Sequence, residues 1–144
     1  MNIHFFNEDI AYNLRQKTLL RNWVSNSITT EKKVVGDLNI IFCSDEYLHQ
    51  MNVQYLKHDN LTDVITFDYS EGRLVSGDIF ISLERIRENA KNFKKKTLDE
   101  IHRVIIHGVL HLCNYSDKGK AEKEKMTLLE NTYLAQRPLK LRAS

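Results

Sequence analysis

Apolar residues recur along this chain with two different spacings, and the spacing changes several times between its ends. Four short segments are rich in β-branched and aromatic residues, which is typical of strands: residues 3–6, 34–42, 63–69 and 77–82. Between the last two lies Ser70-Glu71-Gly72-Arg73, a turn-like sequence. We therefore expect these two strands to form a hairpin.

Longer segments repeat their apolar residues every three to four positions, as amphipathic helices do. They predict five helices, over residues 9–27, 45–55, 82–93, 97–113 and 118–137. Ser44 and Ser82 can cap two of these helices, and Thr97-Leu98-Asp99-Glu100 is typical of a capping box. The alternation predicts an α/β protein, an α+β sandwich in which a small mixed sheet of about four strands packs against about five helices.

Composition narrows the class of protein. The chain has 144 residues, of which 42% are hydrophobic, with five glycines and one proline, so we expect a single domain over residues 1–144. No stretch approaches the roughly 18 apolar residues of a membrane span, and the first residues do not resemble a secretion signal. We therefore expect a cytoplasmic protein without membrane contact. Cys43 and Cys113 give no disulfide framework, so we interpret both as buried thiols.

The most informative segment is His107-Gly108-Val109-Leu110-His111, which lies inside an apolar helical run. Two residues four apart share one face of a helix, with about 5–6 Å between their Cβ atoms, so one metal ion can bridge the two rings. Asp117 can reach the same ion if the helix ends near Cys113 and the chain folds back. Asn114 favours such an ending, because asparagine tolerates the left-handed conformation.

Two histidines in an amphipathic helix are also compatible with ordinary packing, but a buried ring needs polar partners, and a shared cation provides one. Two imidazoles and a carboxylate leave a fourth tetrahedral position open for water, as in catalytic zinc sites. The same three ligands also suit non-haem iron. The composition of the site thus favours zinc and leaves iron open.

The motif His107-Gly108-Val109-Leu110-His111-Leu112 resembles the signature of the YbeY family, bacterial single-strand-specific endoribonucleases that mature ribosomal RNA. Thr62-Asp63-Val64-Ile65-Thr66-Phe67 and Gly77-Asp78-Ile79 resemble two further segments of that family, in the same order. The similarity covers roughly residues 34–134. It implies that His107 and His111 are metal ligands, and it places Asp117 where the family usually has a third histidine.

The resemblance therefore implies a zinc-dependent endoribonuclease, with His107, His111 and Asp117 as catalytic metal ligands to one zinc ion per chain, plus water. It implies ribosomal RNA of the small subunit as the substrate, and ribosomal proteins or assembly GTPases as partners. The family commonly has an arginine where this chain has Leu56. Lys57 or His58 could supply the lost positive contact to RNA, or the segment could simply be a polar loop.

Gly108 separates the hydrolytic alternatives. In His-Glu-x-x-His peptidases the residue after the first histidine is the general base, and here that position has no side chain. RNA carries its own 2′-hydroxyl nucleophile, so endoribonuclease activity is favoured over peptidase activity. Gly108 could let a substrate approach the helix, or it could serve tight packing of the helix on a strand. A noncatalytic RNA-binding ribosome-assembly factor with a structural metal is the alternative from another class.

Two aspartates and two basic segments each allow a functional and a structural interpretation. Asp63 and Asp78 could orient a ligand histidine through its second ring nitrogen, or cap turns. The net charge of +2 does not by itself indicate nucleic acid binding. Basic side chains gather in two segments and could contact phosphates nonspecifically, or be only solvated surface. These are Lys91, Lys94, Lys95 and Lys96, and Arg137, Lys140 and Arg142.

Overall fold

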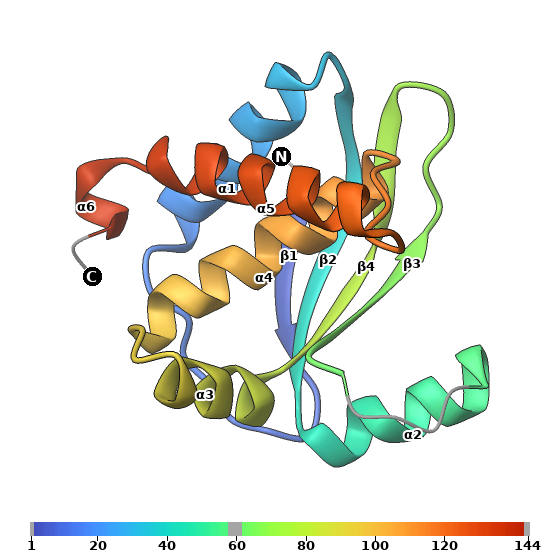
Figure 1. Ribbon diagram of the computed structural model, residues 1–144, viewed down its shortest axis with the longest axis vertical. Helices are drawn as coiled ribbons and strands as arrows, with labels where there is room; N and C mark the ends of the chain where they lie inside the picture. Colours follow the sequence, from blue (N-terminus) through green and yellow to red (C-terminus); the bar gives the residue numbers. More distant parts are fainter. Residues whose placement is uncertain (1, 58–61, 143–144) are drawn as a thin grey trace.

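A four-stranded mixed sheet forms the centre of the computed structural model, which describes residues 2–57 and 62–142. Its spatial order is β1, β2, β4, β3 (Figure 1). The first three of these strands run parallel, and β3 pairs antiparallel with β4 as the predicted hairpin. The strands are β1 (Ile3–Asn7), β2 (Val34–Cys43), β3 (Val64–Asp68) and β4 (Leu74–Ser82).

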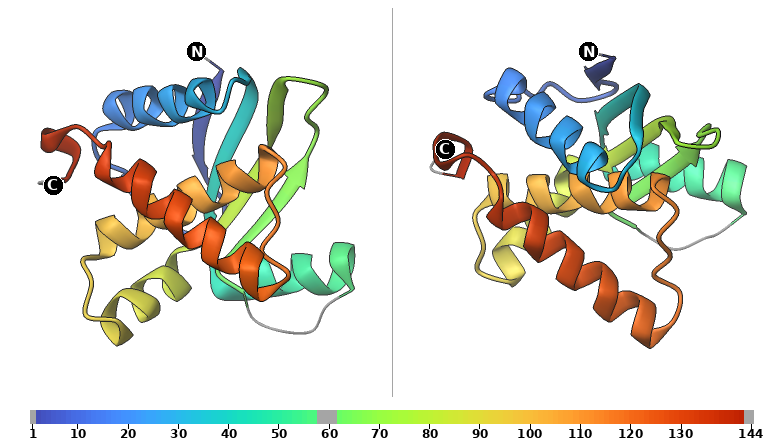
Figure 2. Two further views of the ribbon diagram at one scale, coloured as in Figure 1. Left: turned by 45° about the horizontal axis from the view of Figure 1, so that its top comes forward. Right: turned by 90° about the horizontal axis from the view of Figure 1, so that it is seen from above.

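Helices cover the sheet mainly on one face, and α4 (Thr97–Leu112) lies between the sheet and α5 (Lys120–Ala135) (Figure 2). Sheet residues such as Ile40, Ile79 and Ile81 share one fully buried core with Ile105 and Val109 of α4. The predicted α+β sandwich, with the histidine helix on the sheet, is confirmed. The remaining helices are α1 (Lys17–Thr30), α2 (Asp45–Leu56), α3 (Leu83–Asn92) and α6 (Leu139–Arg142).

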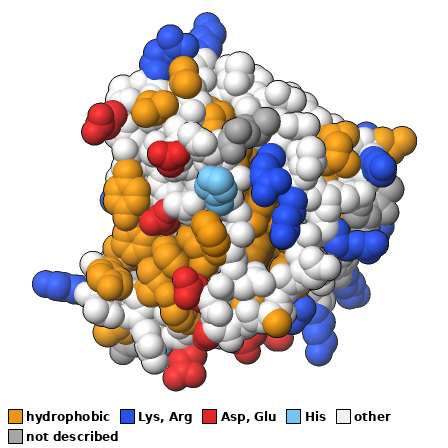
Figure 3. All heavy atoms as spheres, turned by 180° about the vertical axis from the view of Figure 1, so that it is seen from behind, with side chains coloured by type: hydrophobic (Ala, Val, Ile, Leu, Met, Phe, Trp, Pro, Cys, Tyr) orange, Lys and Arg blue, Asp and Glu red, His pale blue; other side chains and the backbone are white. Residues whose placement is uncertain are grey.

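The opposite face of the sheet carries α2 and a smaller apolar cluster, and hydrophobic side chains gather on that side of the molecule (Figure 3). Phe67 and Phe80 meet edge to face, with ring centroids 5.9 Å apart, and Tyr47 stacks on Phe80. This cluster packs α2 against β3 and β4.

The first helix begins at Lys17, so the prediction that it starts at residue 9 was wrong. Asp9 is instead bound to the distant Ser44: one carboxylate oxygen accepts from the Ser44 backbone nitrogen at 2.8 Å, and the other accepts from the Ser44 hydroxyl. Gln16, just before the helix, is in the left-handed conformation at φ 59°. Tertiary hydrogen bonds therefore override the helical pattern over residues 9–16.

The other helix ends follow the predictions with two exceptions. Ser44 and Ser82 accept from the backbone nitrogens of Tyr47 and Arg85, so both predicted caps are confirmed. Thr97 is the first residue of α4 and not its cap, because Lys96 holds the cap position without a side-chain hydrogen bond. The sequence also did not predict the short α6, which begins directly after Pro138, a residue suited to the first turn of a helix.

The two cysteines are buried, as the sequence predicts. Both are free and buried, and burial raises the pKa of Cys43 to about 12 and that of Cys113 to about 11. None of the helices in the described part of the chain combines the length and apolarity that a membrane span requires.

Candidate metal centre

Two histidine rings face each other one turn apart near the end of α4. The Nε2 atoms of His107 and His111 are 3.0 Å apart, and the ring planes make an angle of 81°. Both side chains are partly exposed, at 22% and 25%. The i, i+4 spacing therefore places both rings on one face, as the sequence indicates.

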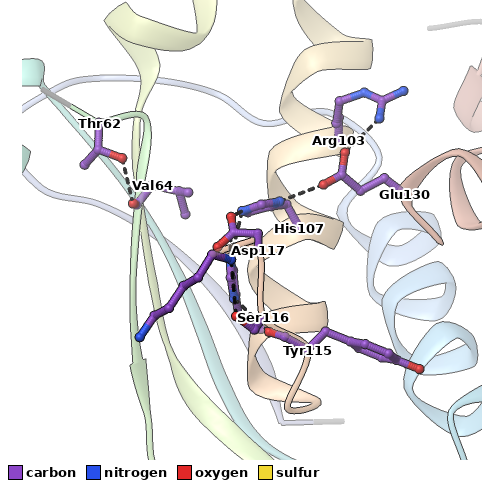
Figure 4. Close-up of polar contacts among 10 residues, drawn as sticks. Thr62, Val64, Arg103, His107, Tyr115, Ser116, Asp117 and Glu130 are labelled. Atoms are coloured by element: carbon purple, nitrogen blue, oxygen red, sulfur yellow. Dashed lines mark hydrogen bonds and ion pairs between the residues drawn. The ribbon is translucent and has the colours of Figure 1, made fainter. Parts of the chain in front are cut away.

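The chain reversal after α4 brings Asp117 back to these rings. Asn114 has φ 79°, and its backbone nitrogen donates to His111 O, while the Tyr115 nitrogen donates to Leu110 O. This pair of hydrogen bonds is a Schellman ending. It directs residues 115–117 back along the helix, so the side chain of Asp117 lies beside His107 (Figure 4).

The three side chains meet at the spacing of a metal site. Asp117 Oδ2 lies 3.4 Å from the Nε2 atom of His107 and 3.4 Å from that of His111. Zinc bonds of about 2.0–2.1 Å in a tetrahedral arrangement separate neighbouring ligand atoms by about 3.3 Å. These three residues form a group that could hold a metal ion.

The other ring nitrogens show which lone pairs face the centre. His107 Nδ1 lies 2.6 Å from Glu130 Oε2, and His111 Nδ1 lies 3.0 Å from the carbonyl oxygen of Tyr115. Because both partners are acceptors, each Nδ1 carries the proton and each Nε2 presents a lone pair. Two lone pairs and a carboxylate oxygen thus converge on one point. These electron-rich atoms repel one another, and a bound cation would stabilise them.

Glu130 of α5 connects His107 to the guanidinium group of Arg103. Its Oε1 atom accepts from Arg103 Nη1 at 2.8 Å, so one buried carboxylate binds two side chains that are one turn apart on α4 (Figure 4). Burial opposes ionisation of Glu130, but the hydrogen bonds from His107 and Arg103 outweigh it and lower its pKa. Such a carboxylate behind a ligand histidine fixes the ring and its tautomer.

The loop that carries Asp117 is fixed from α1. Glu31, which follows α1, accepts hydrogen bonds from the hydroxyls of Tyr115 and Tyr133, the first at 2.5 Å. Tyr115 is also the residue whose carbonyl accepts from His111. A single carboxylate therefore holds the loop after α4 and helix α5 in the position that the site needs.

The three residues line a cavity of about 510 Å³ between α4 and β3. Three more carboxyl groups line it: Asp63 just before β3, Glu100 one turn before Arg103, and Glu130. Burial raises the pKa of Asp63 and that of Glu100, although neighbouring His107 and Arg103, respectively, oppose the shift. Arg103 is the one cationic side chain among the described residues that line this cavity, which we call the metal pocket.

Of the residues proposed for substrate contact, Lys57 and Gly108 do not line this pocket. Lys57 is exposed in the left-handed position that ends α2, and it does not line the pocket, whereas Leu56 does. His58 lies outside the described residues. Gly108 is buried against β4, where a Cβ atom would lie 2.8 Å from Ile79 Cγ2. Its position supports packing of the helix on β4 over close approach of a substrate.

The sequence did not identify Glu130, which performs the role considered for Asp63 and Asp78. Asp78 accepts a hydrogen bond from Asn39 on the far side of the sheet, and both histidine Nδ1 atoms are bound elsewhere. One signal was available: Glu130 repeats at helical spacing with the buried Met126 and Leu134. A carboxylate on an apolar face needs a buried partner, which can be a ligand histidine.

The chain thus has an α+β fold in which two imidazoles and a carboxylate meet at one cavity, and these three side chains could hold a metal ion. This arrangement is typical of metal-binding proteins. Comparison with known proteins gives the family. The family model described as "Endoribonuclease YbeY" matches residues 2–137. The chain therefore belongs to the YbeY family.

Curated relatives agree along nearly the full length of the chain. The chain is 51% identical to the endoribonuclease YbeY of Flavobacterium psychrophilum over 129 residues, which cover 90% of this chain and 92% of that protein. It is 47% identical to the endoribonuclease YbeY of Parabacteroides distasonis, covering 94% and 95%. The solution structure of TM1509 from Thermotoga maritima has the same fold, with a TM-score of 0.68 at 24% identity, covering 98% of this chain and 92% of that one.

Proposed function

We propose that this chain is a zinc-dependent, single-strand-specific endoribonuclease that acts in ribosomal RNA maturation. The observation that carries the proposal is the convergence of His107, His111 and Asp117 at 3.0–3.4 Å at a cavity of about 510 Å³. Relatives that are 47–51% identical to the chain are named endoribonucleases. As a single domain over residues 1–144, the chain would carry the whole activity.

The ligand set supports a catalytic over a structural metal. Within the described residues, the group of side chains whose ligand atoms lie within 4.8 Å of one another contains two histidines and one aspartate. Structural zinc sites use four protein ligands, whereas catalytic sites keep one position open. When bound, zinc supplies Lewis-acid polarisation of a phosphoryl oxygen and lowers the pKa of water.

The chain's own residues hold the histidines in place and handle protons. Glu130 keeps His107 in the tautomer whose Nε2 lone pair faces the site, and the Tyr115 carbonyl does the same for His111. Asp63 lines the pocket and is half-buried, and burial raises its pKa, which favours a carboxyl group that can both accept and release a proton. We propose Asp63 as the proton-handling residue at the pocket wall.

The experiment compares two substrates and two proteins, the wild-type chain and one double variant. Chain purified without chelator is expected to contain about one zinc ion per molecule and to cut unstructured RNA while casein remains intact. The double variant His107→Ala, His111→Ala should lose both the zinc and the RNA cleavage. Degradation of casein with survival of RNA would establish a peptidase instead, and RNA binding without cleavage would favour an assembly factor.

A further inference from the structure

The two basic segments of the chain, about 40 residues apart, line one groove beside the metal pocket. A second cavity, of about 750 Å³, lies between the start of α4 and the end of α5. Lys95 reaches it from the segment before α4, and Arg137 and Arg142 reach it from the segment after α5. We call this cavity the basic groove.

The basic groove adjoins the metal pocket, because Arg103 and Glu100 of α4 line both cavities. The groove therefore follows α4 from the region of His107 toward its first turn at Thr97. The rise of 1.5 Å per residue makes this path about 15 Å long. A stacked strand advances about 3.4 Å per nucleotide, so the path has room for several nucleotides.

The cations of the groove differ in whether a carboxylate of the protein already binds them. Arg137 is fixed: its Nη1 atom donates to Asp99 Oδ1 at 3.0 Å and to His102 Nδ1 at 2.8 Å. Lys95 and Arg142 are exposed, and neither forms an ion pair with a carboxylate among the described residues. These two side chains can therefore bind an external anion without breaking an existing pair.

An exposed aromatic ring lies at the same groove. Phe93, which follows α3, lines the cavity and leaves 67% of its surface accessible. Flat aromatic faces next to cations are the usual means of binding single-stranded nucleic acid, since every base can stack on them. Among the described residues that line the metal pocket there is no Phe, Tyr or Trp, and Arg103 is the one cation beside four carboxylates, so phosphates that flank the cleaved bond gain little attraction there.

We propose that the basic groove is a second binding site for single-stranded RNA, in which Lys95 and Arg142 contact phosphates and Phe93 stacks on a base. The proposal rests on the proposed endoribonuclease function and extends it. A substrate strand whose scissile phosphate lies in the metal pocket passes Arg103 and continues along α4 into the groove. Long substrates then bind more tightly than short ones.

The test uses a pair of charge reversals, Lys95→Glu with Arg142→Glu, in the zinc-loaded protein. Binding of a 2′-O-methylated single-stranded dodecanucleotide is measured by fluorescence anisotropy over a range of salt concentrations. We expect Kd to rise by about tenfold or more, and the slope of log K against log salt to fall by about 1.4 for two lost phosphate contacts. Cleavage of a tetranucleotide and zinc content should remain unchanged.

The matched control reverses two exposed cations that line neither cavity, Lys32→Glu with Arg73→Glu, and changes the net charge equally. It should leave the affinity for the dodecanucleotide nearly at the wild-type value. Phe93→Leu keeps an apolar side chain but removes the ring, and should weaken binding by about fivefold or more.

An unchanged affinity and salt slope in the groove variant, or an equal loss in the control, would overturn the proposal. That result is distinct from failure of the proposed function, in which the wild-type chain loaded with zinc cuts neither oligonucleotide. Binding that depends on the groove without any cleavage would leave the groove as an RNA-binding surface and refute the enzyme.

Discussion

The metal pocket and the basic groove share the wall formed by Glu100 and Arg103, yet they have opposite charge. The pocket is lined by four carboxylates and one arginine, with two histidines between them. The groove has four cations against two carboxylates, and one of those carboxylates is paired with Arg137. The acidic pocket suits a metal cation, and the groove suits a polyanion.

This difference separates the chemistry from the binding of the substrate. A bound divalent cation offsets the negative charge of the pocket, so a phosphate can enter there only when the metal is present. The groove needs no metal to attract phosphates. Changes in the pocket should therefore act on metal affinity and cleavage, whereas changes in the groove should act on affinity for long substrates.

The largest effect is expected when the pocket loses Asp117, the carboxylate that we propose as the third metal ligand. Asp117→Ala leaves two histidines and should weaken zinc binding by orders of magnitude, because three ligands are the usual minimum for a catalytic site. Asp117→His should restore zinc binding. Calorimetric titration of zinc into each purified variant measures this, and undiminished affinity in Asp117→Ala would show that the third ligand lies elsewhere.

A second test concerns the wall of the groove, where buried His102 anchors Arg137. Burial, followed by the charge of Arg137, lowers the pKa of His102 from 6.5 to about 4. Between these pH values the unfolded chain binds a proton that the folded chain does not. Stability conferred by the neutral ring is therefore complete above about pH 6.5 and falls by about 3 kcal/mol as the pH decreases to about 4.

His102→Gln keeps an acceptor for Arg137 but cannot titrate. Urea unfolding at about pH 7 and about pH 4.5 should show a smaller decrease in the free energy of unfolding for this variant than for the wild type. The comparison uses the difference between the two pH values, so a constant packing cost of the substitution cancels. An equal decrease in both proteins would mean that His102 titrates normally.

Glu130→Gln tests the support of the pocket without removing a ligand. The amide keeps the size of the side chain but loses the charge that orients His107 and binds Arg103. We expect zinc affinity to fall by about 10–100-fold, the usual effect of losing a partner behind a ligand histidine. Glu122→Gln, exposed on the same helix, is the control and should bind zinc like the wild type.

The parts of the molecule that the sequence predicts are those determined by local spacing. The four-residue separation of His107 and His111 places both rings on one face of the helix. Asn114 indicates the helix end after which the chain reverses and Asp117 returns to the two histidines. The strands and the hairpin follow from short β-branched runs between turn residues. Each of these relations spans fewer than about twenty residues, so it can be recognised in one short stretch of sequence.

The parts that the sequence did not predict depend on contacts between distant segments. Asp9 binds Ser44 across 35 residues, and this contact removes the start of the expected first helix. Glu130 meets His107 across 23 residues, and Lys95 meets Arg142 only through the cavity that both line. Spacing along the chain contains no information on which helices pack together, so these partners required the structure.

The smallest effect is expected on the side of α4 that faces neither cavity. In Gly108→Ala the new Cβ atom would lie 2.8 Å from Ile79 Cγ2 and 3.1 Å from its Cδ1, so the helix and β4 must separate slightly. Overpacking costs about 1–3 kcal/mol, whereas alanine in place of glycine returns about 1 kcal/mol of helix propensity. We expect a net loss of about 1 kcal/mol in the free energy of unfolding.

The double variant Gly108→Ala, Ile79→Val removes the methyl group at Cδ1 and should recover part of that loss, while zinc content and the KM for RNA stay at the wild-type values in both proteins. A large rise in KM with unchanged stability would instead show that substrate reaches Gly108, and would require the strand to bind on the sheet side of α4.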